Sequence, residues 1–283
     1  MALQILFLFL FGAVLGSFLN VLILRYELGG AVFGRHLKGR SHCPHCNKTL
    51  SWYELIPIIS FIIQLGRCRE CRQKISLQYP VVEIMAGVIV ATIPQILGFT
   101  PFALIWVIAL LVLLVMSFID VRHYVIPDAL TIIIALLGVA VAAILMIGDV
   151  SRFTIIPGTF LGDYALVFSF TDNPWLARLF AAFIGGAFFS SIILLSRGKA
   201  MGWGDAKFVG AIGLLMGWPD TLMAIMIAFI VGAIVGILML VSKKKKFKDI
   251  LPFGPFIALG VIMVVYFGHD IISLYFRFLH LGV

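Results

Sequence analysis

Residues 101–120 read PFALIWVIALLVLLVMSFID, and only the last of them, Asp120, carries a charge. About 20 apolar residues are enough for a helix to cross the hydrocarbon core of a bilayer, so this run predicts a membrane-spanning helix that ends in an acid. The whole chain agrees, because 62% of its 283 residues are hydrophobic and only 12% are charged. A soluble domain is about half apolar and about a quarter charged, so the composition excludes that class.

Further apolar runs predict an all-α integral membrane protein with about eight transmembrane helices. The predicted spans are residues 2–24, 80–98, 101–120, 127–148, 174–196, 205–217, 219–241 and 252–268. The run over 2–24 has no positive n-region and no small-residue cleavage site, so we expect a retained helix rather than a removed signal peptide. Residues 271–278 predict a separate interfacial helix with aromatic anchors.

Three Gly-x-x-x-Gly pairs lie in these runs: Gly12 with Gly16, Gly213 with Gly217, and Gly232 with Gly236. Such pairs either let two membrane helices approach closely or are ordinary membrane-helix glycines. The sequence leaves both interpretations open for each pair.

The basic residues predict the orientation in the membrane. The segments 25–79, 121–126, 197–207 and 242–251 fall on one side of the eight-helix scheme and hold 18 of the 21 Lys and Arg residues. The positive-inside rule makes this side cytoplasmic and both termini external. The lysine run Lys243–Lys246 fits a topological anchor or a contact with anionic membrane lipid. Because the basic residues are spread over short loops, the net charge of +8 does not predict nucleic-acid binding.

The outer segment 149–173 is apolar for a loop and contains Gly and Pro breaks. We expect it to lie in the membrane interface or to dip into the membrane, and the sequence assigns it no function.

Four cysteines in the segment 25–79 predict a metal site. Cys43 and Cys46 form one C-x2-C pair, and Cys68 and Cys71 form a second pair after 21 residues. Two such pairs can hold Zn²⁺ tetrahedrally, and four protein ligands make the site structural rather than catalytic. Two disulfides or an iron–sulfur cluster are the alternatives, and a reducing cytoplasm disfavours the disulfides. We expect the nearby His42 and His45 to be solvated.

A second acid, Asp205, stands between apolar runs in the stretch Met201–Lys207, with sequence MGWGDAK. A carboxylate near membrane depth costs about 2.5–3.5 kcal/mol on insertion scales, which makes it a candidate functional residue. We expect the neighbouring glycines to supply backbone freedom at this point. Asp120 ends the third predicted helix and Asp205 begins the sixth, so both are expected at the cytoplasmic boundary.

Two carboxylates that share a site cannot both ionise comfortably, so one of them keeps a proton. The ionised member can activate water while the protonated member polarises a peptide carbonyl, as in aspartic proteases. The alternative for Asp120 and Asp205 is a structural buried charge, paired with Arg122 or Lys207.

Asp128 is a second candidate for the partner of Asp205. The sequence Ile126-Pro127-Asp128, however, is typical of a helix start, where Pro fits the first turn and an acid faces the positive helix end. We therefore expect a structural role for Asp128 and an interfacial position for His123.

Several motifs together resemble the bacterial type IV prepilin peptidases, in the order found in that family from about residue 10 to 265. They are Gly16–Val21, Arg40–Cys46, Leu50–Pro57, Cys68–Cys71, Ile75–Glu83, Asp120 with Pro127-Asp128, and the Gly-x-Gly-Asp sequence Gly202–Asp205.

The resemblance implies a bifunctional inner-membrane enzyme with a cytoplasmic active site. It would cut the short basic leader from type IV prepilins or type II secretion pseudopilins, with Asp120 and Asp205 as the catalytic aspartates. It would then N-methylate the new amino terminus with S-adenosylmethionine. A peptidase without methylation is one alternative, and a non-enzymatic membrane assembly or transport protein is another.

The methyl donor site cannot be identified from the sequence, which lacks a Rossmann-type glycine-rich loop. The resemblance places methylation in the segment 25–79, near the polar residues Asn20, Glu54 and Glu83. We expect residues 1–98 to form a first domain with the zinc loop and residues 99–268 to form a six-helix peptidase domain. Residues 269–283 are expected to form an interfacial tail.

Overall fold

The structure is a computed structural model of the whole chain, and it describes residues 2–28, 32, 34, 39–147, 158–199, 201–242 and 251–278. These residues form helices and no strands, apart from two isolated β-bridges in the cysteine loop. The lysine run Lys243–Lys246 and part of the segment 149–173 lie outside the described residues.

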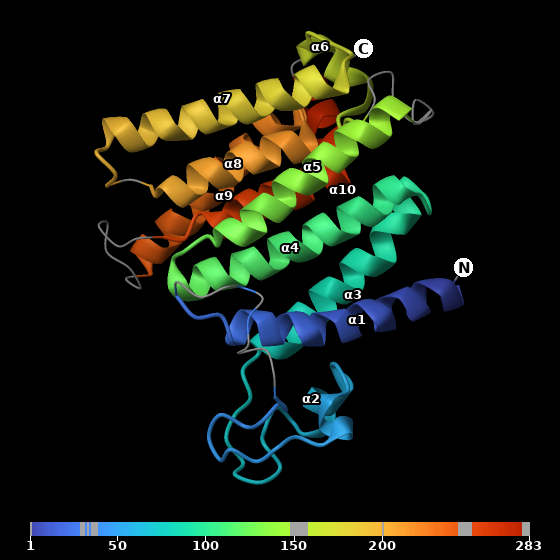
Figure 1. Cartoon of the computed structure of the whole chain (residues 1–283), viewed down its shortest axis with the longest axis vertical. Helices are drawn as coiled ribbons and strands as arrows, with labels where there is room; N and C mark the ends of the chain where they lie inside the picture. Colours follow the sequence, from blue (N-terminus) through green and yellow to red (C-terminus); the bar gives the residue numbers. More distant parts are fainter. Residues whose placement is uncertain are drawn as a thin grey trace. The chain divides into compact units, whose positions relative to one another are not determined.

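The helices follow the apolar runs of the sequence (Figure 1). The long helices are α1 (Ala2–Leu24), α3 (Gln78–Leu97), α4 (Pro101–His123), α5 (Asp128–Ile147), α7 (Pro174–Leu195), α8 (Trp203–Met216), α9 (Asp220–Val241) and α10 (Gly254–Phe278). Four shorter elements lie in the connections: η2 (Trp52–Leu55), α2 (Ile59–Ile63), η4 (Gly162–Tyr164) and α6 (Ala165–Phe168).

The predicted all-α membrane fold is confirmed. Among the described residues, seven helices are long and apolar enough to cross a membrane, namely α1, α3, α4, α5, α7, α9 and α10. The predicted sixth span, α8, has only 14 residues. At 1.5 Å per residue it is about 21 Å long, which is shorter than the roughly 30 Å hydrocarbon core. The eight predicted spans are therefore seven full-length helices and one short helix.

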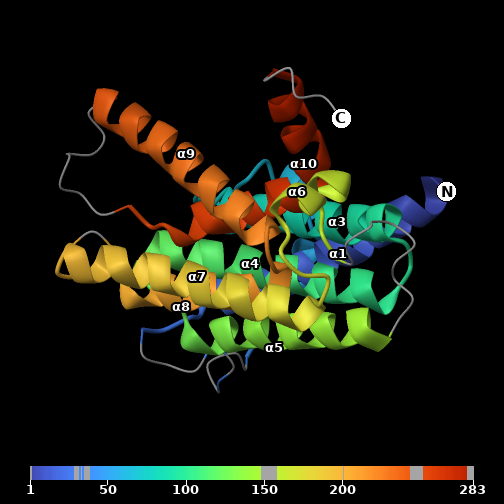
Figure 2. The ribbon, with the colours of Figure 1, turned by 90° about the horizontal axis from the view of Figure 1, so that it is seen from above.

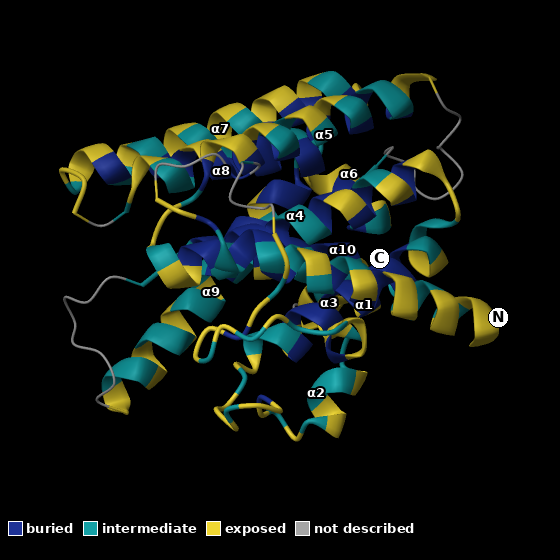
Figure 3. Cartoon of the chain, turned by 60° about the horizontal axis from the view of Figure 1, so that its bottom comes forward, coloured by how far each residue is buried: buried dark blue, intermediate teal, exposed yellow. Residues whose placement is uncertain are grey.

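The outer surfaces of the long helices are apolar, as expected for contact with lipid. Figure 3 shows exposed residues in stripes along the helices. Large side chains are among them, for example Phe7 with 69% of its surface exposed and Phe183 with 72%. A soluble protein rarely exposes such continuous apolar area, so the structure is that of a multi-pass membrane protein.

The chain divides into two compact units, Met1–Val115 and Met116–Val283, and α4 runs across the division. In the first unit α1 packs against α3. In the second unit α8 packs against both α5 and α7 (Figures 1 and 2). The predicted domain limits at residues 98 and 268 remain predictions.

Glycines allow close helix packing at one of the three predicted pairs, Gly12 with Gly16, and at one member of a second pair, Gly213. A Cβ on Gly12 would lie 2.7 Å from the Ala86 carbonyl oxygen, and a Cβ on Gly16 would lie 2.7 Å from the Glu83 Cα. Both atoms belong to α3, and real Cβ atoms do not come so close. The close approach predicted for the Gly12 and Gly16 pair is therefore confirmed.

The other two pairs behave differently. Gly213 packs against the backbone of α7, but Gly217 follows the end of α8 with a φ angle of 83°, which favours glycine. A Cβ on Gly232 or Gly236 would make only ordinary contacts, at 3.4 and 3.6 Å. The interpretation of the last pair as a close-packing motif is wrong.

The last helix is longer than predicted. α10 runs without interruption from Gly254 to Phe278, ten residues beyond the predicted end at 268. The segment 271–278 is therefore the last part of α10 and not a separate helix.

The register of α8 against α7 sets the depth of Asp205. A Cβ on Gly213 would lie 2.4 Å from the Ala182 nitrogen, and the Trp218 N–H donates to the Ala177 carbonyl at 3.2 Å. The two helices are thus antiparallel, and the same register places Asp205 level with residue 190. Because α7 ends at Leu195, Asp205 lies about five residues, or about 7 Å, inside that end.

We predict that Gly213→Ala destabilises the protein, because the added methyl group would overlap the α7 backbone. Overpacking of this kind costs about 1–3 kcal/mol, which should lower the melting temperature measured in detergent by several degrees. Gly186→Ala is the matched control, since nothing lies within 4 Å of its added Cβ. Equal melting temperatures for the two variants would contradict the packing described here.

Candidate catalytic aspartates and metal site

The four cysteines form one cluster in the first unit. Their sulfur atoms all lie within 4.8 Å of one another, with 3.8 Å between Cys43 and Cys71 and 4.0 Å between Cys46 and Cys68. Four thiolates placed tetrahedrally at 2.3 Å from one Zn²⁺ are separated by about 3.8 Å. The cluster therefore has the dimensions of a four-cysteine metal site, and the cysteines are not joined by disulfides.

The two C-x2-C turns share one backbone pattern. The Cys43 N–H donates to the Lys48 carbonyl, and the Asn47 N–H donates back to the Cys43 carbonyl, both at 2.9 Å. The second turn repeats these bonds between Cys68 and Gln73 and between Arg72 and Cys68. A β-bridge flanks each turn, His42 with Thr49 and Arg67 with Lys74. The loop thus presents two equivalent pairs of thiols to one point.

Backbone N–H groups already favour one thiolate in the cluster. Those of Cys71 and Glu70 lower the pKa of Cys68 to about 7. The Gln73 N–H acts in the same direction on Cys71, but desolvation and the other three sulfurs outweigh it and raise the pKa of Cys71 to about 11. Metal binding must therefore displace at least the Cys71 proton.

The histidines next to the cluster are not part of it. His42 and His45 are exposed, and the described metal-ligating group contains only cysteines. Lys48, next to the first turn, forms ion pairs on both sides. Its ammonium lies 3.7 Å from the Glu54 carboxylate and 3.6 Å from the carboxylate of Glu70 in the second turn.

The three polar residues expected near a methyl donor site are buried and held by backbone groups. The Asn20 side chain donates to the Tyr79 carbonyl at 3.1 Å. Glu54 accepts from the Ser51 N–H at 2.9 Å, and Glu83 accepts from the Ile58 N–H at 2.8 Å. The Asn20 and Glu83 bonds join separate parts of the first unit, and the Glu54 bond caps η2, so each residue has a structural function whatever else it does.

Asp120 is buried, with 4% of its surface exposed, three residues before the end of α4. Its Oδ2 atom accepts from the Gly254 N–H at 2.9 Å. Gly254 is the first residue of α10, so the carboxylate faces the positive end of that helix. A Cβ on Gly254 would lie only 2.7 Å from the same Oδ2 atom, so this contact requires glycine. Gly254 was not predicted as a site residue, and its position in Pro252-Phe253-Gly254-Pro255 is its only signal in the sequence.

Asp205 is half-buried in the first turn of α8. Its Oδ2 atom accepts from the Gly202 N–H at 3.3 Å, which is one half of a capping box. Gly202 has no side chain to complete the box. Like Asp120, Asp205 therefore accepts a bond at the N-terminus of a helix, and the charge of Asp120 acts on it electrostatically.

The predicted function of the glycines around Asp205 needs correction. Gly202 has φ −88° and ψ 155°, which any residue can adopt. Neither Gly202 nor Gly204 has a positive φ angle. Gly204 lies inside α8, where an added Cβ would make only an ordinary contact with the Ile126 Cβ at 3.4 Å.

The basic residues expected to pair with Asp120 or Asp205 in a purely structural role, Arg122 and Lys207, do not do so. The Lys207 ammonium lies 3.0 Å from Asp128. Asp128 begins α5, so its expected position at a helix start is confirmed. Arg122 is exposed. Within the described part of the chain, neither Asp120 nor Asp205 forms an ion pair with a basic residue.

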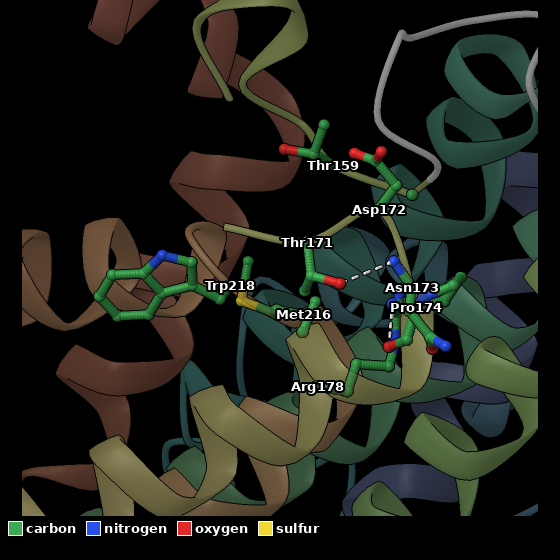
Figure 4. A pocket seen from close by; sticks show the side chains of 10 residues that line it. Thr159, Thr171, Asp172, Asn173, Pro174, Arg178, Met216 and Trp218 are labelled. Carbon is green, nitrogen blue, oxygen red and sulfur yellow. Dashed lines mark hydrogen bonds between the residues drawn. The ribbon is translucent and has the colours of Figure 1, made fainter. Parts of the chain in front are cut away.

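A second buried charged group lies near the N-terminal ends of α7 and α9. Asp220 is 1% exposed and accepts from the Thr159 hydroxyl at 2.7 Å and from the Phe160 N–H at 2.9 Å. Arg178 is 3% exposed and donates to the Pro174 carbonyl at 3.3 Å. It borders a cavity of about 10 Å³ (Figure 4), which has room for about one water molecule. Asp220 and Arg178 were not predicted as a buried charged group, although a charge in an apolar span is itself a signal.

Comparisons with known proteins show which family the chain belongs to. The family model described as "Bacterial Peptidase A24 N-terminal domain" matches residues 10–95, and that of the "Type IV leader peptidase family" matches residues 107–237. A prepilin leader peptidase/N-methyltransferase from Burkholderia pseudomallei (strain 1026b) is 31% identical, over 94% of this chain and 86% of its own length. The chain belongs to the type IV leader peptidase family.

Two further members of this family are similar to the chain over nearly its whole length. The prepilin leader peptidase/N-methyltransferase of Bacillus subtilis (strain 168) is 30% identical over 95% of this chain and 97% of its own length. That of Stutzerimonas stutzeri is 29% identical over 95% and 93%. No solved structure matches the chain.

Membership confirms the resemblance inferred from the sequence motifs, and with it the predicted class of enzyme. The N-terminal family match contains all four cysteines, and the second match contains both Asp120 and Asp205.

We predict that the purified protein holds one metal ion per chain and that Cys43→Ser lowers this content strongly, because one of four ligands is lost. Metal retention should also fall as the pH is lowered, because protons compete with the metal for the thiolates. Elemental analysis after dialysis measures both effects. His45→Ala is the control and should keep its metal, and an unchanged content in Cys43→Ser would contradict the site.

Proposed function

We propose that this protein cleaves the leader peptide of type IV prepilins or pseudopilins at the cytoplasmic face of the bacterial inner membrane. Asp120 and Asp205 carry out the hydrolysis. The observation that carries this assignment is the pair formed by the buried Asp120 and the half-buried Asp205, neither of them ion-paired to a basic residue in the described structure. A charged residue in an apolar span is expensive, which makes each of them a functional candidate.

In the proposed reaction the two aspartates share one proton and titrate as a pair. The ionised carboxylate takes a proton from water as the water oxygen attacks the scissile carbonyl carbon. The protonated carboxylic acid gives its proton to the carbonyl oxygen. Proton return to the leaving amine then breaks the C–N bond and restores the pair.

The structure supports specific functions for the groups around this pair. The Gly254 N–H fixes one oxygen of Asp120, and the Gly202 N–H fixes one oxygen of Asp205. Each oriented oxygen leaves the other oxygen of the carboxyl group for water or the peptide. Preorganised groups of this kind lower the cost of reorganisation during the reaction.

The cytoplasmic location is supported by the basic residues. The C-terminal end of α4 and the N-terminal end of α8 border segments on the Lys- and Arg-rich side of the chain, which the positive-inside rule makes cytoplasmic.

We further propose that the metal in the cysteine cluster is Zn²⁺ and that it is structural. All four positions are taken by Cys43, Cys46, Cys68 and Cys71, so no coordination site is left for a substrate. When bound, the ion would order a polar loop that has little core of its own.

The second proposed activity is N-methylation of the new amino terminus with S-adenosylmethionine. The names of the relatives support it, since they combine peptidase and N-methyltransferase. We assign it to the N-terminal region with the cysteine loop.

We predict that Asp120→Asn and Asp205→Asn each reduce prepilin cleavage by at least about a hundredfold, the scale of losing an acid or base group. Asn keeps an oxygen that can accept the Gly254 or Gly202 N–H bond, so both variants should fold and retain metal. Mass spectrometry of a purified prepilin incubated with each variant measures cleavage.

Asp128→Asn is the matched control. It removes only an exposed ion pair worth about 0–1 kcal/mol, so its cleavage rate should stay near that of the wild type. Normal cleavage by either Asp120→Asn or Asp205→Asn would refute the assignment. Pilin that has already been cleaved should still be methylated by both variants, because methylation is assigned to the N-terminal region.

We also predict that Gly254→Ala lowers cleavage at least about tenfold by displacing the Asp120 carboxylate, since misplacement by about 1 Å can cost a hundredfold. The measurement is the cleavage rate together with the melting temperature in detergent. Gly236→Ala is the control, because its added Cβ has its nearest neighbour at 3.6 Å. Unchanged cleavage by a folded Gly254→Ala would show that this contact does not position Asp120.

A further inference from the structure

The cysteine loop contains an apolar stretch that the proposed reaction does not explain. Residues 55–66, between Glu54 and Arg67, read LIPIISFIIQLG and carry no charge. They follow η2, contain α2 and lead into the second C-x2-C turn. A loop in water would not be expected to place such a run outside its core.

Five large apolar side chains of this stretch are exposed. None of the residues of α2 is buried, and the exposed fractions are 63% for Ile62, 65% for Ile63 and 85% for Leu65. Ile59 and Leu55 are also exposed. We call residues 55–65 the apolar wedge. Large exposed patches of this kind mark a surface that meets a membrane or a partner.

One hydrogen bond sets the depth of the apolar wedge. The Ile58 N–H donates to the Glu83 carboxylate at 2.8 Å. Glu83 lies five residues beyond the start of α3 at Gln78, or about 7 Å along a membrane-spanning helix. The start of α2 is therefore held below the first turn of α3. Figures 1 and 3 agree, since α2 lies beside the length of α1 and not beyond its C-terminal end.

Backbone N–H groups along the apolar wedge are satisfied within the protein, which favours entry into lipid, where unsatisfied polar groups are expensive. Ile58 donates to Glu83, and Ser60 and Ile62 donate to the carbonyls of Ile56 and Ile58. Further along, the N–H groups of Gln64, Leu65 and Gly66 donate to the carbonyls of Ser60, Ile62 and Phe61. These amides need no water.

The edges of the apolar wedge have the residues typical of a membrane surface. Trp52 is 78% exposed and lies edge-on to Tyr53, and such amphipathic rings favour the headgroup level. The Arg69 guanidinium lies 5.0 Å from the centre of the Tyr53 ring. Arg67 and Lys74 add positive charge on the polar side, which suits the anionic headgroups of the cytoplasmic leaflet.

We propose that the apolar wedge inserts into the cytoplasmic leaflet as a re-entrant element, with lipid acyl chains as its partner. Glu83 anchors the wedge from α3, and the basic and aromatic residues at its edge contact the headgroups. The cysteine turns are thereby held at the membrane surface on both sides of the wedge.

Quenching of a single added tryptophan tests this proposal. Ile62→Trp would be compared with His45→Trp, which adds the ring at an exposed position of the first cysteine turn, in nanodiscs of phosphatidylglycerol and acyl-brominated phosphatidylcholine. We expect the added fluorescence of Ile62→Trp, over that of the wild type, to be quenched at least about twofold more strongly by bromine in the hydrocarbon core. Acrylamide in the water should quench the added fluorescence of His45→Trp more strongly than that of Ile62→Trp.

Ile63→Trp serves as a second probe if Ile62→Trp does not keep its metal. Equal bromine quenching at Ile62 and His45, with both open to acrylamide, would overturn the proposal. Shielding from acrylamide that appears only after a prepilin is added would assign this face to the substrate, and would overturn it as well.

Discussion

Three buried carboxylates on the long helices are satisfied by main-chain N–H groups and not by ion pairs at close range. Asp120 accepts from Gly254, Glu83 from Ile58, and Asp220 from Phe160, at 2.8 to 2.9 Å. In each case the acid lies on a long apolar helix and the donor lies where a non-helical segment meets a helix or turn. A buried carboxylate without such bonds would cost several kcal/mol. These bonds therefore fix the positions of segments that the apolar runs alone leave undetermined.

Much of the fold could be predicted because bilayer thickness constrains it. The spans of α1, α4, α7 and α9 begin and end within a few residues of the apolar runs in the sequence. The end of α10 could not be predicted in this way, because His269 and Asp270 interrupt the run although the helix continues through them. α2 was not expected either, since a helix of five residues has too little periodicity to be recognised.

The two acids of the candidate site could be identified from the sequence, but the groups that hold them in place could not. Asp120 and Asp205 are conspicuous because a charge in an apolar run is expensive. Gly254 is 134 residues from Asp120 in sequence, and no local pattern connects them. The glycines around Asp205 invited a conformational explanation, yet their φ angles need none, and an added Cβ at Gly204 would make only an ordinary contact with Ile126. The close contact of Gly254 with Asp120 depends on tertiary neighbours and is not visible in the sequence.

The short length of α8 has a geometric consequence for any substrate that is itself anchored in the bilayer. The register with α7 sets Asp205 about 7 Å inside the end of that helix, at a depth fixed by rigid packing. If Asp205 cleaves the substrate as proposed, the peptide bond must come to this depth beside α7, without helical hydrogen bonds around the bond to be cut. The fixed depth of Asp205 would then select the cleavage position by its distance from the substrate's own transmembrane helix, and not by the side chains at that position.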